Sequence, residues 1–232
     1  MVVSLFVNPL QFGPREDYKR YPRDRKGDLG KLRRERVDIA FIPSAAGLYR
    51  RGFQTAVSVE KLSQSLCGRF RPGHFQGVAT VCAKLFALIE PERAYFGEKD
   101  FQQLRVIETL VEELNLPIRI RRHPIVREGD GVAMSSRNRY LSALQRKIAT
   151  RLYQALLKGR EAILRGERGA GAVEREMRRA LRHPRIRVDY LEAVNPKDLS
   201  PLHRLRGQVL LAGAIRLGRT RLIDNILVKV SS

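Results

Sequence analysis

Apolar positions in the first 140 residues occur in two patterns, as short continuous runs and as helical stripes. Residues 2–7 form an almost continuous, β-branched apolar run. Such a run predicts a strand buried on both faces, as in parallel sheets. Charged residues over 24–36 predict a helix, and the apolar run 37–42 predicts a second strand. A right-handed parallel crossover is the default for this strand–helix–strand unit.

The clearest helix of the chain is predicted over 78–89. Its apolar residues recur at 3.6-residue spacing and form one stripe: Val78, Val81, Cys82, Leu85, Phe86 and Ile89. Further strands are expected over 54–59, 93–96 and 118–123, with a helix over 100–113. This alternation predicts an α/β fold with a parallel sheet.

The order of elements changes after Ser142. Two helices are predicted over 143–165 and 172–181, followed by strands over 188–194, 209–215 and 220–228. Helices followed by strands indicate a separate small α+β domain. We therefore expect one domain over residues 1–139 and a second over 140–232.

The net charge of +21 changes this picture little, because of how the charge is distributed. Basic residues occur throughout the chain, mostly on predicted helix faces that also carry Glu, which is typical of solvated faces. No basic run is interleaved with aromatic residues, so nucleic acid is not an expected partner.

No apolar run approaches the roughly 20 residues of a membrane-spanning helix. The start lacks signal-peptide features, so a cytoplasmic protein is expected. The two cysteines, Cys67 and Cys82, lack the spacing of a disulfide framework or a zinc site.

Residues 96–103 lie where a strand ends and a helix begins. Helix N-termini at the carboxyl ends of strands attract anions, and a nucleotide suits this place. Gly97 permits close approach of the backbone, and Lys99 offers a point charge to a phosphate. The alternative is that Glu98 and Asp100 cap the helix, since acidic residues are favoured there.

Three other loops carry polar groups suited to substrate binding. Two hydroxyls beside Arg137, in the segment 134–138, can hold phosphate oxygens, although such loops are usually only solvated. The amide of Gln11 suits a hydroxy acid, whereas Asn8-Pro9 also explains the same segment as a turn. In the basic loop 69–77, residues Arg69, Arg71 or His74 can contact phosphate, or the loop is a structural turn.

Five segments, taken together and in order, resemble motifs of the pantothenate synthetase family. They span 4–12 (S-L-F-V-N-P-L-Q-F), 71–78 (R-P-G-H-F-Q-G-V), 96–103 (F-G-E-K-D-F-Q-Q), 135–138 (S-S-R-N) and 221–225 (R-L-I-D-N). The resemblance covers essentially the whole chain. It implies a Rossmann-like nucleotidyltransferase (adenylyltransferase) domain with a parallel sheet, a small C-terminal α+β domain, and usually a homodimer.

The resemblance also implies a reaction and a set of site residues. ATP activates (R)-pantoate as pantoyl-adenylate, and β-alanine then displaces AMP to give pantothenate. Gln11 and Gln103 would hold pantoate, with Gln11 also near β-alanine. Lys99 and Arg137 would stabilise charge on the reacting phosphates, and Mg²⁺ would arrive with the nucleotide, without a separate protein metal site. The implied ATP-binding residues are Gly97, Glu98, Lys99, Asp100, Val126, Met134, Ser135, Ser136 and Arg137.

One departure from the family concerns histidine. Ahead of the segment that matches residues 4–12, the family has a strand, a P-T-M-G loop and an H-x-G-H helix that contacts ATP. The four histidines here, at 74, 123, 183 and 203, include no H-x-G-H. We therefore expect a truncated or misassigned start, an N-terminally incomplete Rossmann-like domain, and weak or lost activity. The alternative is a non-catalytic nucleotide-binding or dimerising fragment of the family.

Overall fold

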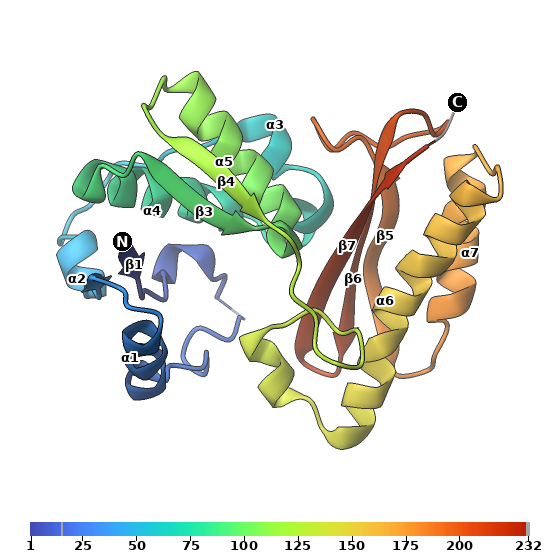
Figure 1. Ribbon diagram of the computed structural model, residues 1–232, viewed down its shortest axis with the longest axis horizontal. Coiled ribbons are helices and arrows are strands. Elements are labelled where there is room, and N and C mark those ends of the chain that lie inside the picture. Colours follow the sequence, from blue (N-terminus) through green and yellow to red (C-terminus); the bar gives the residue numbers. More distant parts are fainter. Residues whose placement is uncertain (15, 231–232) are drawn as a thin grey trace.

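The computed structural model describes residues 1–14 and 16–230 (Figure 1). Its N-terminal part is an α/β arrangement, as predicted. The main elements are β1 (Val2–Ser4), α1 (Arg25–Arg34), β2 (Ile39–Phe41), α4 (His74–Ile89), β3 (Arg93–Gly97), α5 (Phe101–Glu113) and β4 (Arg119–His123). Short helices fill the connections: η1 (Pro9–Gln11), α2 (Ala45–Leu48), α3 (Glu60–Ser63), η2 (Leu66–Phe70) and η3 (Glu98–Asp100). Within the described residues, no helix is long and apolar enough to cross a membrane.

The parallel strands form two separate pairs. β1 pairs with β2, with Val3 opposite Ala40, and β3 pairs with β4, with Tyr95 opposite Arg121. Across residues 1–14 and 16–230, no strand hydrogen bonds join the two pairs. The parallel arrangement predicted from sequence is confirmed.

The expected burial of the first strand on both faces is wrong. Val2 is 39% exposed, and residues 3–7 are at most partly buried, because β1 mainly contacts β2 and no described helix packs extensively on its faces. The strand expected over 54–59 is also absent from this segment. The amide of Val57 donates instead to Oγ1 of Thr80 on α4, at 3.0 Å. The segment therefore packs on a helix and joins neither pair of strands.

The C-terminal part contains η4 (Ser136–Tyr140), α6 (Ala143–Leu164), α7 (Ala170–Leu181), β5 (Ile186–Val194), β6 (Gln208–Leu217) and β7 (Thr220–Lys229). The three strands form one antiparallel sheet with β6 in the middle. Helices α6 and α7 lie beside one face of this sheet (Figure 1). Ser142 caps α6 through a capping box with Gln145, as its position in the sequence predicts.

The C-terminal sheet takes part in two hydrophobic cores. Leu191, Leu211 and Ile215 pack with the buried residues of α6 and α7. On the other face, Tyr190 and Leu210 belong to the core that contains α4 and α5. Because one sheet is shared by both cores, the two parts of the chain are held in a fixed relation.

The N-terminus of α4 packs directly on the loop that follows β1. The side chain of Asn8 donates to the carbonyl of Gly77 at 2.9 Å and accepts from the hydroxyl of Tyr49 at 2.8 Å. A Cβ atom on Gly77 would lie 2.2 Å from the carbonyl oxygen of Leu10, so only glycine fits there. This contact places η1, and therefore Gln11, beside the start of α4.

We predict opposite effects for two glycine-to-alanine substitutions in helices. Gly77→Ala forces η1 away from α4 and is expected to lower the free energy of unfolding by roughly 2–3 kcal/mol. Gly30→Ala is the matched control, because an added Cβ in α1 meets no atom within 4 Å. Higher helix propensity is expected to raise its stability by about 1 kcal/mol. Urea unfolding of both variants checks this, and equal midpoints would contradict the close approach.

Candidate active site

A cavity of ≈ 1190 Å³ lies between the two parts of the chain. The loop after β1, the segment before α4, η3, η4 and the C-terminal sheet all contribute to its walls. Four of the predicted site residues line it: Lys99, Asp100, Ser135 and Arg137. Gln103 lines a smaller adjoining hollow together with Lys99 and Asp100. The other predicted residues, Gln11, Gly97, Glu98, Val126, Met134 and Ser136, are not among the lining residues of either space.

Lys99 lies in the turn η3, between the end of β3 and the start of α5. The side-chain amide of Asn225, on β7, donates to the carbonyls of Glu98 at 2.9 Å and Lys99 at 3.0 Å. This turn is therefore held from the C-terminal sheet. A side chain at Gly97 would meet no atom within 4 Å, so this side of the turn is open.

The sequence offered the explanation that Glu98 and Asp100 cap the helix, and the hydrogen bond expected of a capping Asp100 is not formed. Asp100 occupies the N-cap position of α5, but its side chain makes no capping hydrogen bond. Its carboxylate instead lies 3.9 Å from Nζ of Lys99. The ammonium and the carboxylate both remain at the wall of the cavity.

Arg137 lies on η4, and its guanidinium is held by an acidic residue of the loop after β1. Nε and Nη2 donate to the two carboxylate oxygens of Asp17, both at 2.9 Å. Burial by itself raises the pKa of Asp17, but the hydrogen bonds and charge of Arg137 outweigh it, so this pKa lies below its ordinary value. The hydroxyl of Ser136 bonds that of Tyr21 at 3.0 Å, which joins the same two segments.

A second acidic residue of this loop holds the basic residues before α4. Nε and Nη2 of Arg71 donate to the carboxylate of Glu16, at 2.7 and 2.6 Å. Nη1 of Arg71 lies 2.9 Å from Nε2 of His74, and Nδ1 of His74 lies 2.9 Å from the carbonyl of Gln11. An arginine can only donate, so Nε2 accepts and Nδ1 carries the proton. Burial, and then the charge of Arg71, lower the pKa of His74 to about 4.

His74 is therefore a neutral group that positions the backbone at Gln11. This geometry supports the structural-turn interpretation of the basic loop at Arg71 and His74. The side-chain amide of Gln11 makes no hydrogen bond to other described residues, so it is available to a ligand. Glu16 and Asp17 were missed as site residues, because their arginine partners lie 55 and 120 positions away in the sequence.

The two neighbouring glutamines of α5 have different roles. Gln102 is buried, accepts from the amide of Cys67 at 2.9 Å and donates to the carbonyls of Leu62 and Ser65. Gln103 makes no hydrogen bond to other described residues and faces the hollow beside Lys99. Gln102 is thus structural, and the amide of Gln103 is free to bind a ligand.

Two further predicted residues come together at the edge of the site. The amide of Met134 donates to the carbonyl of Val126 at 2.9 Å, so the two residues lie side by side. Their side chains are exposed, which makes an apolar surface next to the polar turns. An apolar surface beside cationic groups suits a nucleotide base and its phosphates.

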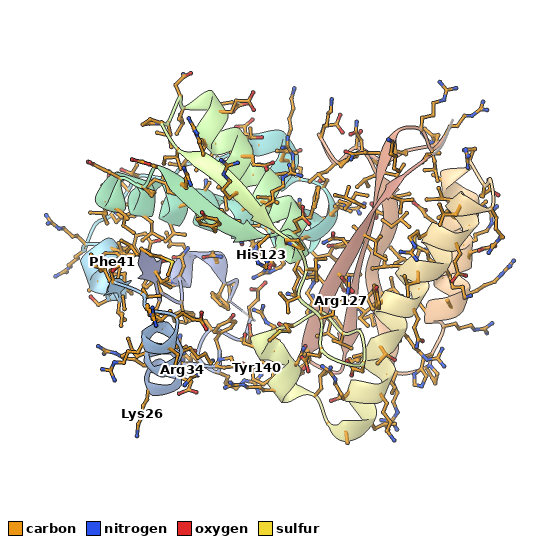
Figure 2. All side chains as sticks on the ribbon, viewed as in Figure 1. Lys26, Arg34, Phe41, His123, Arg127 and Tyr140 are labelled. Atoms are coloured by element: carbon orange, nitrogen blue, oxygen red, sulfur yellow. The ribbon has the colours of Figure 1, made fainter. Side chains whose placement is uncertain are left out.

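Arg127 and Asp224 complete the attachment between the two parts of the chain. The guanidinium of Arg127 donates to both carboxylate oxygens of Asp224, at 2.6 and 3.0 Å, and lies 3.6 Å from the ring centre of Tyr153 on α6. Figure 2 labels Arg127 beside β6 and β7. Burial raises the pKa of Asp224 more than Arg127 lowers it. Asp224 and Asn225 lie in the segment that matches R-L-I-D-N. The motif drew attention to these residues, but it did not predict which residues they contact.

His74 gives a testable pH dependence of stability. Unfolded histidine takes up a proton near its ordinary pKa of 6.5, whereas folded His74 stays neutral down to about 4. Its contribution is therefore complete above pH 6.5 and is lost as the pH falls. We expect a loss of about 2 kcal/mol between pH 7.5 and 5. The pKa values of Glu16 and Asp17 lie below their ordinary 4.5 and 3.8. The stability that these carboxylates contribute is therefore lost only as the pH falls below those ordinary values, outside the range that tests His74.

Urea unfolding of the native chain and of His74→Asn at pH 7.5, 6.5 and 5 measures this effect. The asparagine amide can still donate to the carbonyl of Gln11 but does not titrate. The native chain is expected to lose about 2 kcal/mol more than the variant over this range. Parallel pH profiles for the two proteins would contradict a neutral, buried His74.

Comparisons with known proteins agree with this geometry along nearly the whole chain. Residues 1–227 match the sequence profile of the family described as pantoate-beta-alanine ligase. A pantothenate synthetase from Thermosipho melanesiensis is 50% identical over 228 residues, which cover 98% of this chain and 81% of that protein. One from Syntrophomonas wolfei is 50% identical over 232 residues, covering 99% of this chain and 82% of that protein.

Solved structures give the same result. The pantoate-beta-alanine ligase (pantothenate synthetase) crystal structure from Thermus thermophilus has a TM-score of 0.95 and 48% identity, covering 100% of this chain and 83% of that one. A Francisella tularensis pantoate-beta-alanine ligase, complexed with beta-gamma ATP and beta-alanine, has a TM-score of 0.77 and 30% identity, covering 97% and 78%. Because the family profile covers residues 1–227 and the relatives are about 50% identical over nearly the whole chain, this chain belongs to the pantoate–β-alanine ligase family.

Proposed function

We propose that this chain joins (R)-pantoate to β-alanine in an ATP-dependent reaction that releases AMP and pyrophosphate. One observation carries the assignment of the reacting centre. Lys99 stands in a turn that Asn225 on β7 fixes by a hydrogen bond, and it lines the same cavity as Arg137. The family relationship supplies the reaction, and the cavity supplies a place in which Lys99 and Arg137 can both face phosphates.

The proposed reaction has two steps. A carboxylate oxygen of pantoate attacks the α-phosphorus of ATP, and the bond to the leaving pyrophosphate breaks. The uncharged amine of β-alanine then attacks the activated carbonyl carbon, the bond to AMP breaks, and the amine loses a proton. Lys99 and Arg137 stabilise the negative charge on the α-phosphoryl group and on pyrophosphate, so catalysis rests on electrostatics and positioning.

The remaining site residues are assigned in the same proposal. Gln11 and Gln103 have free side-chain amides and hold pantoate, with Gln11 also near β-alanine. Mg²⁺ would arrive with the nucleotide and would neutralise part of its phosphate charge. The described residues contain no group of three or more His, Cys, Asp or Glu side chains suited to a metal ion. ATP is bound by Gly97, Glu98, Lys99, Asp100, Val126, Met134, Ser135, Ser136 and Arg137.

Arg137 can take part in this reaction while it remains paired with Asp17. The carboxylate accepts from Nε and Nη2, which leaves the N–H groups of Nη1 for a phosphate oxygen. Asp17 therefore orients the guanidinium as well as compensating its charge. Tyr21 supports the same orientation, because the guanidinium carbon lies 5.1 Å from its ring centre.

We further propose that the ATP site is completed by an H-x-G-H segment outside these 232 residues. The four histidines of the sequence do not supply such a pair, and the one that lines the cavity, His74, is fully engaged by Arg71 and Gln11. The competing proposal is a fragment that binds nucleotide or dimerises without turnover. If the H-x-G-H segment contributes ATP ligands, adding it to the 232 residues would raise their activity. If the chain is a fragment that only binds nucleotide or dimerises, adding the segment would not change its activity.

The proposal also covers assembly, location and domain organisation. We propose a homodimer in the cytoplasm, with small-molecule substrates and no nucleic acid as a partner. The domain boundary is placed at Arg139, within η4 and ahead of the capping box that begins α6. Arg71 and Arg137 are paired with Glu16 and Asp17, which reduces the net positive charge of the cavity. A reduced charge suits a small anionic substrate better than the many phosphates of a nucleic acid.

Pantoate-dependent exchange of labelled pyrophosphate into ATP tests the proposed function. Lys99→Gln is expected to lower the exchange rate by at least about 100-fold, because a positioned charge on the reacting phosphates is lost. Lys61→Gln, on the exposed side of α3, makes the same charge change and is expected to leave the rate unchanged. Equal rates for the two variants would contradict the role of Lys99.

The same assay separates the competing proposals when it is run on the 232 residues and on a version extended by an H-x-G-H segment. Faster exchange by the extended protein supports completion of the ATP site by histidines. Equal exchange by both proteins contradicts it. Calorimetry that detects ATP binding by the 232 residues, with no exchange in either form, supports the fragment proposal.

A further inference from the structure

Three arginines lie side by side across the C-terminal sheet, on the face that lines the cavity. Arg187 on β5 is opposite Arg216 on β6, and Arg216 is opposite Arg221 on β7. All three line the cavity. Neighbouring strands are about 5 Å apart, so the sheet places the three arginines at adjacent positions. We call Arg187, Arg216 and Arg221 the arginine row.

A single carboxylate compensates the arginine row. The pairing of β5 with β6 shifts register between Val188 and Tyr190, and the irregularity places Asp189 between two of the arginines. Nε of Arg216 and Nε of Arg221 donate to its two oxygens, at 3.0 and 2.8 Å. The side chain of Asp189 is only 1% exposed, so it is committed to this role. Three positive charges thus face one negative charge.

The remaining donors of the row are largely unused. Arg187 is exposed and makes no ion pair with any residue of the described chain. Nη1 of Arg221 lies 3.4 Å from Sγ of Cys67, and its Nη2 is buried without a hydrogen-bond partner. The exposed guanidinium of Arg187 makes no hydrogen bond to the described residues, so its donors are available to an anion in the cavity.

The row differs from the other arginines of the cavity. Arg71 and Arg137 each have a carboxylate of their own, bound through two donors. The row also lies away from Lys99. Asn225, which holds the carbonyl of Lys99, is four residues beyond Arg221 on β7, about 13 Å along the strand. The proposed ligase residues therefore leave the arginine row unassigned.

We infer that the arginine row is a second anion site of the cavity, which binds the phosphate oxyanions of a diphosphate or polyphosphate. Guanidinium forks match phosphate oxygens in geometry, and a net charge of about +2 over neighbouring strands suits a ligand with more than one negative charge. The ligand is either free diphosphate or the phosphate tail of a nucleotide, which share this chemistry. The inference depends on the cavity wall and does not require the ligase reaction.

Titration calorimetry with sodium pyrophosphate, at fixed ionic strength and without pantoate, tests the site. The variants are Arg187→Gln alone and Arg187→Gln combined with Arg216→Gln. We expect the double variant to bind pyrophosphate at least about tenfold more weakly than the native chain, since charge-assisted hydrogen bonds are lost. The single variant is expected to lose about threefold, and it leaves the Asp189 pairs intact, so it preserves the fold if the double variant does not.

The matched control is Arg185→Gln combined with Arg206→Gln, which removes two exposed arginines of the same part of the chain that do not line the cavity. It is expected to bind within about twofold of the native chain, as only screened long-range charge changes. An equal loss in the control, or no loss in either row variant, would overturn the site. So would loss of all pyrophosphate binding in Arg137→Gln, because the anion would then bind only beside Lys99 and Arg137.

A second titration with ATP identifies the source of the phosphate. Weaker binding of both ATP and pyrophosphate by the row variants shows that the row holds the phosphate tail of the nucleotide. Weaker binding of pyrophosphate alone shows that it holds free diphosphate. Both results uphold the anion site. An absence of pantoate-dependent exchange in the protein extended by an H-x-G-H segment, with intact pyrophosphate binding, would reject the proposed function while the arginine row stands.

Discussion

The side-chain amide of Asn225 fixes the turn that carries Lys99, and the arrangement of the cavity depends on this attachment. It donates to two successive carbonyls, and its own backbone amide donates to Asp224 at 2.8 Å. Asp224 is in turn held by Arg127. A buried polar group left without a partner costs about 1–3 kcal/mol, and breaking a buried ion pair costs about 3–5 kcal/mol. The turn that carries Lys99 is therefore held by the C-terminal sheet as well as by α5.

The same principle, a cation held by a carboxylate from another segment, shapes the rest of the cavity. Glu16 and Asp17 are neighbours in one loop, yet they hold arginines from two different walls. Both carboxylates have pKa values below their ordinary values, so these pairs are intact at neutral pH. His74 adds a neutral link to Gln11. The cavity can therefore present several cationic groups to a polyanion without the repulsion that isolated charges would create.

Local sequence patterns predicted the helices, because a helix is specified by neighbouring residues along the chain. The apolar stripe over 78–89 identified α4, and Ser142 marked the start of α6. The strand expected over 54–59 failed because a short apolar run does not specify its hydrogen-bond partner, here Thr80. The motifs nominated Lys99, Ser135 and Arg137, and all three line the cavity. The contacts of Asp17 with Arg137 and of Asn225 with the Lys99 carbonyl were not predicted, because contacts across 120 and 126 residues leave no periodic trace in the sequence.

Hydrogen exchange of Asn225→Ala tests the central claim, that β7 fixes the turn at Lys99. If the claim is correct, loss of the two hydrogen bonds to the carbonyls of Glu98 and Lys99 accelerates exchange of the backbone amides over residues 98–102. Exchange in α6, which lies on the far face of the sheet, stays as in the native chain. Unchanged exchange over 98–102 would contradict the claim and would show that β3 and α5 hold the turn without the C-terminal sheet.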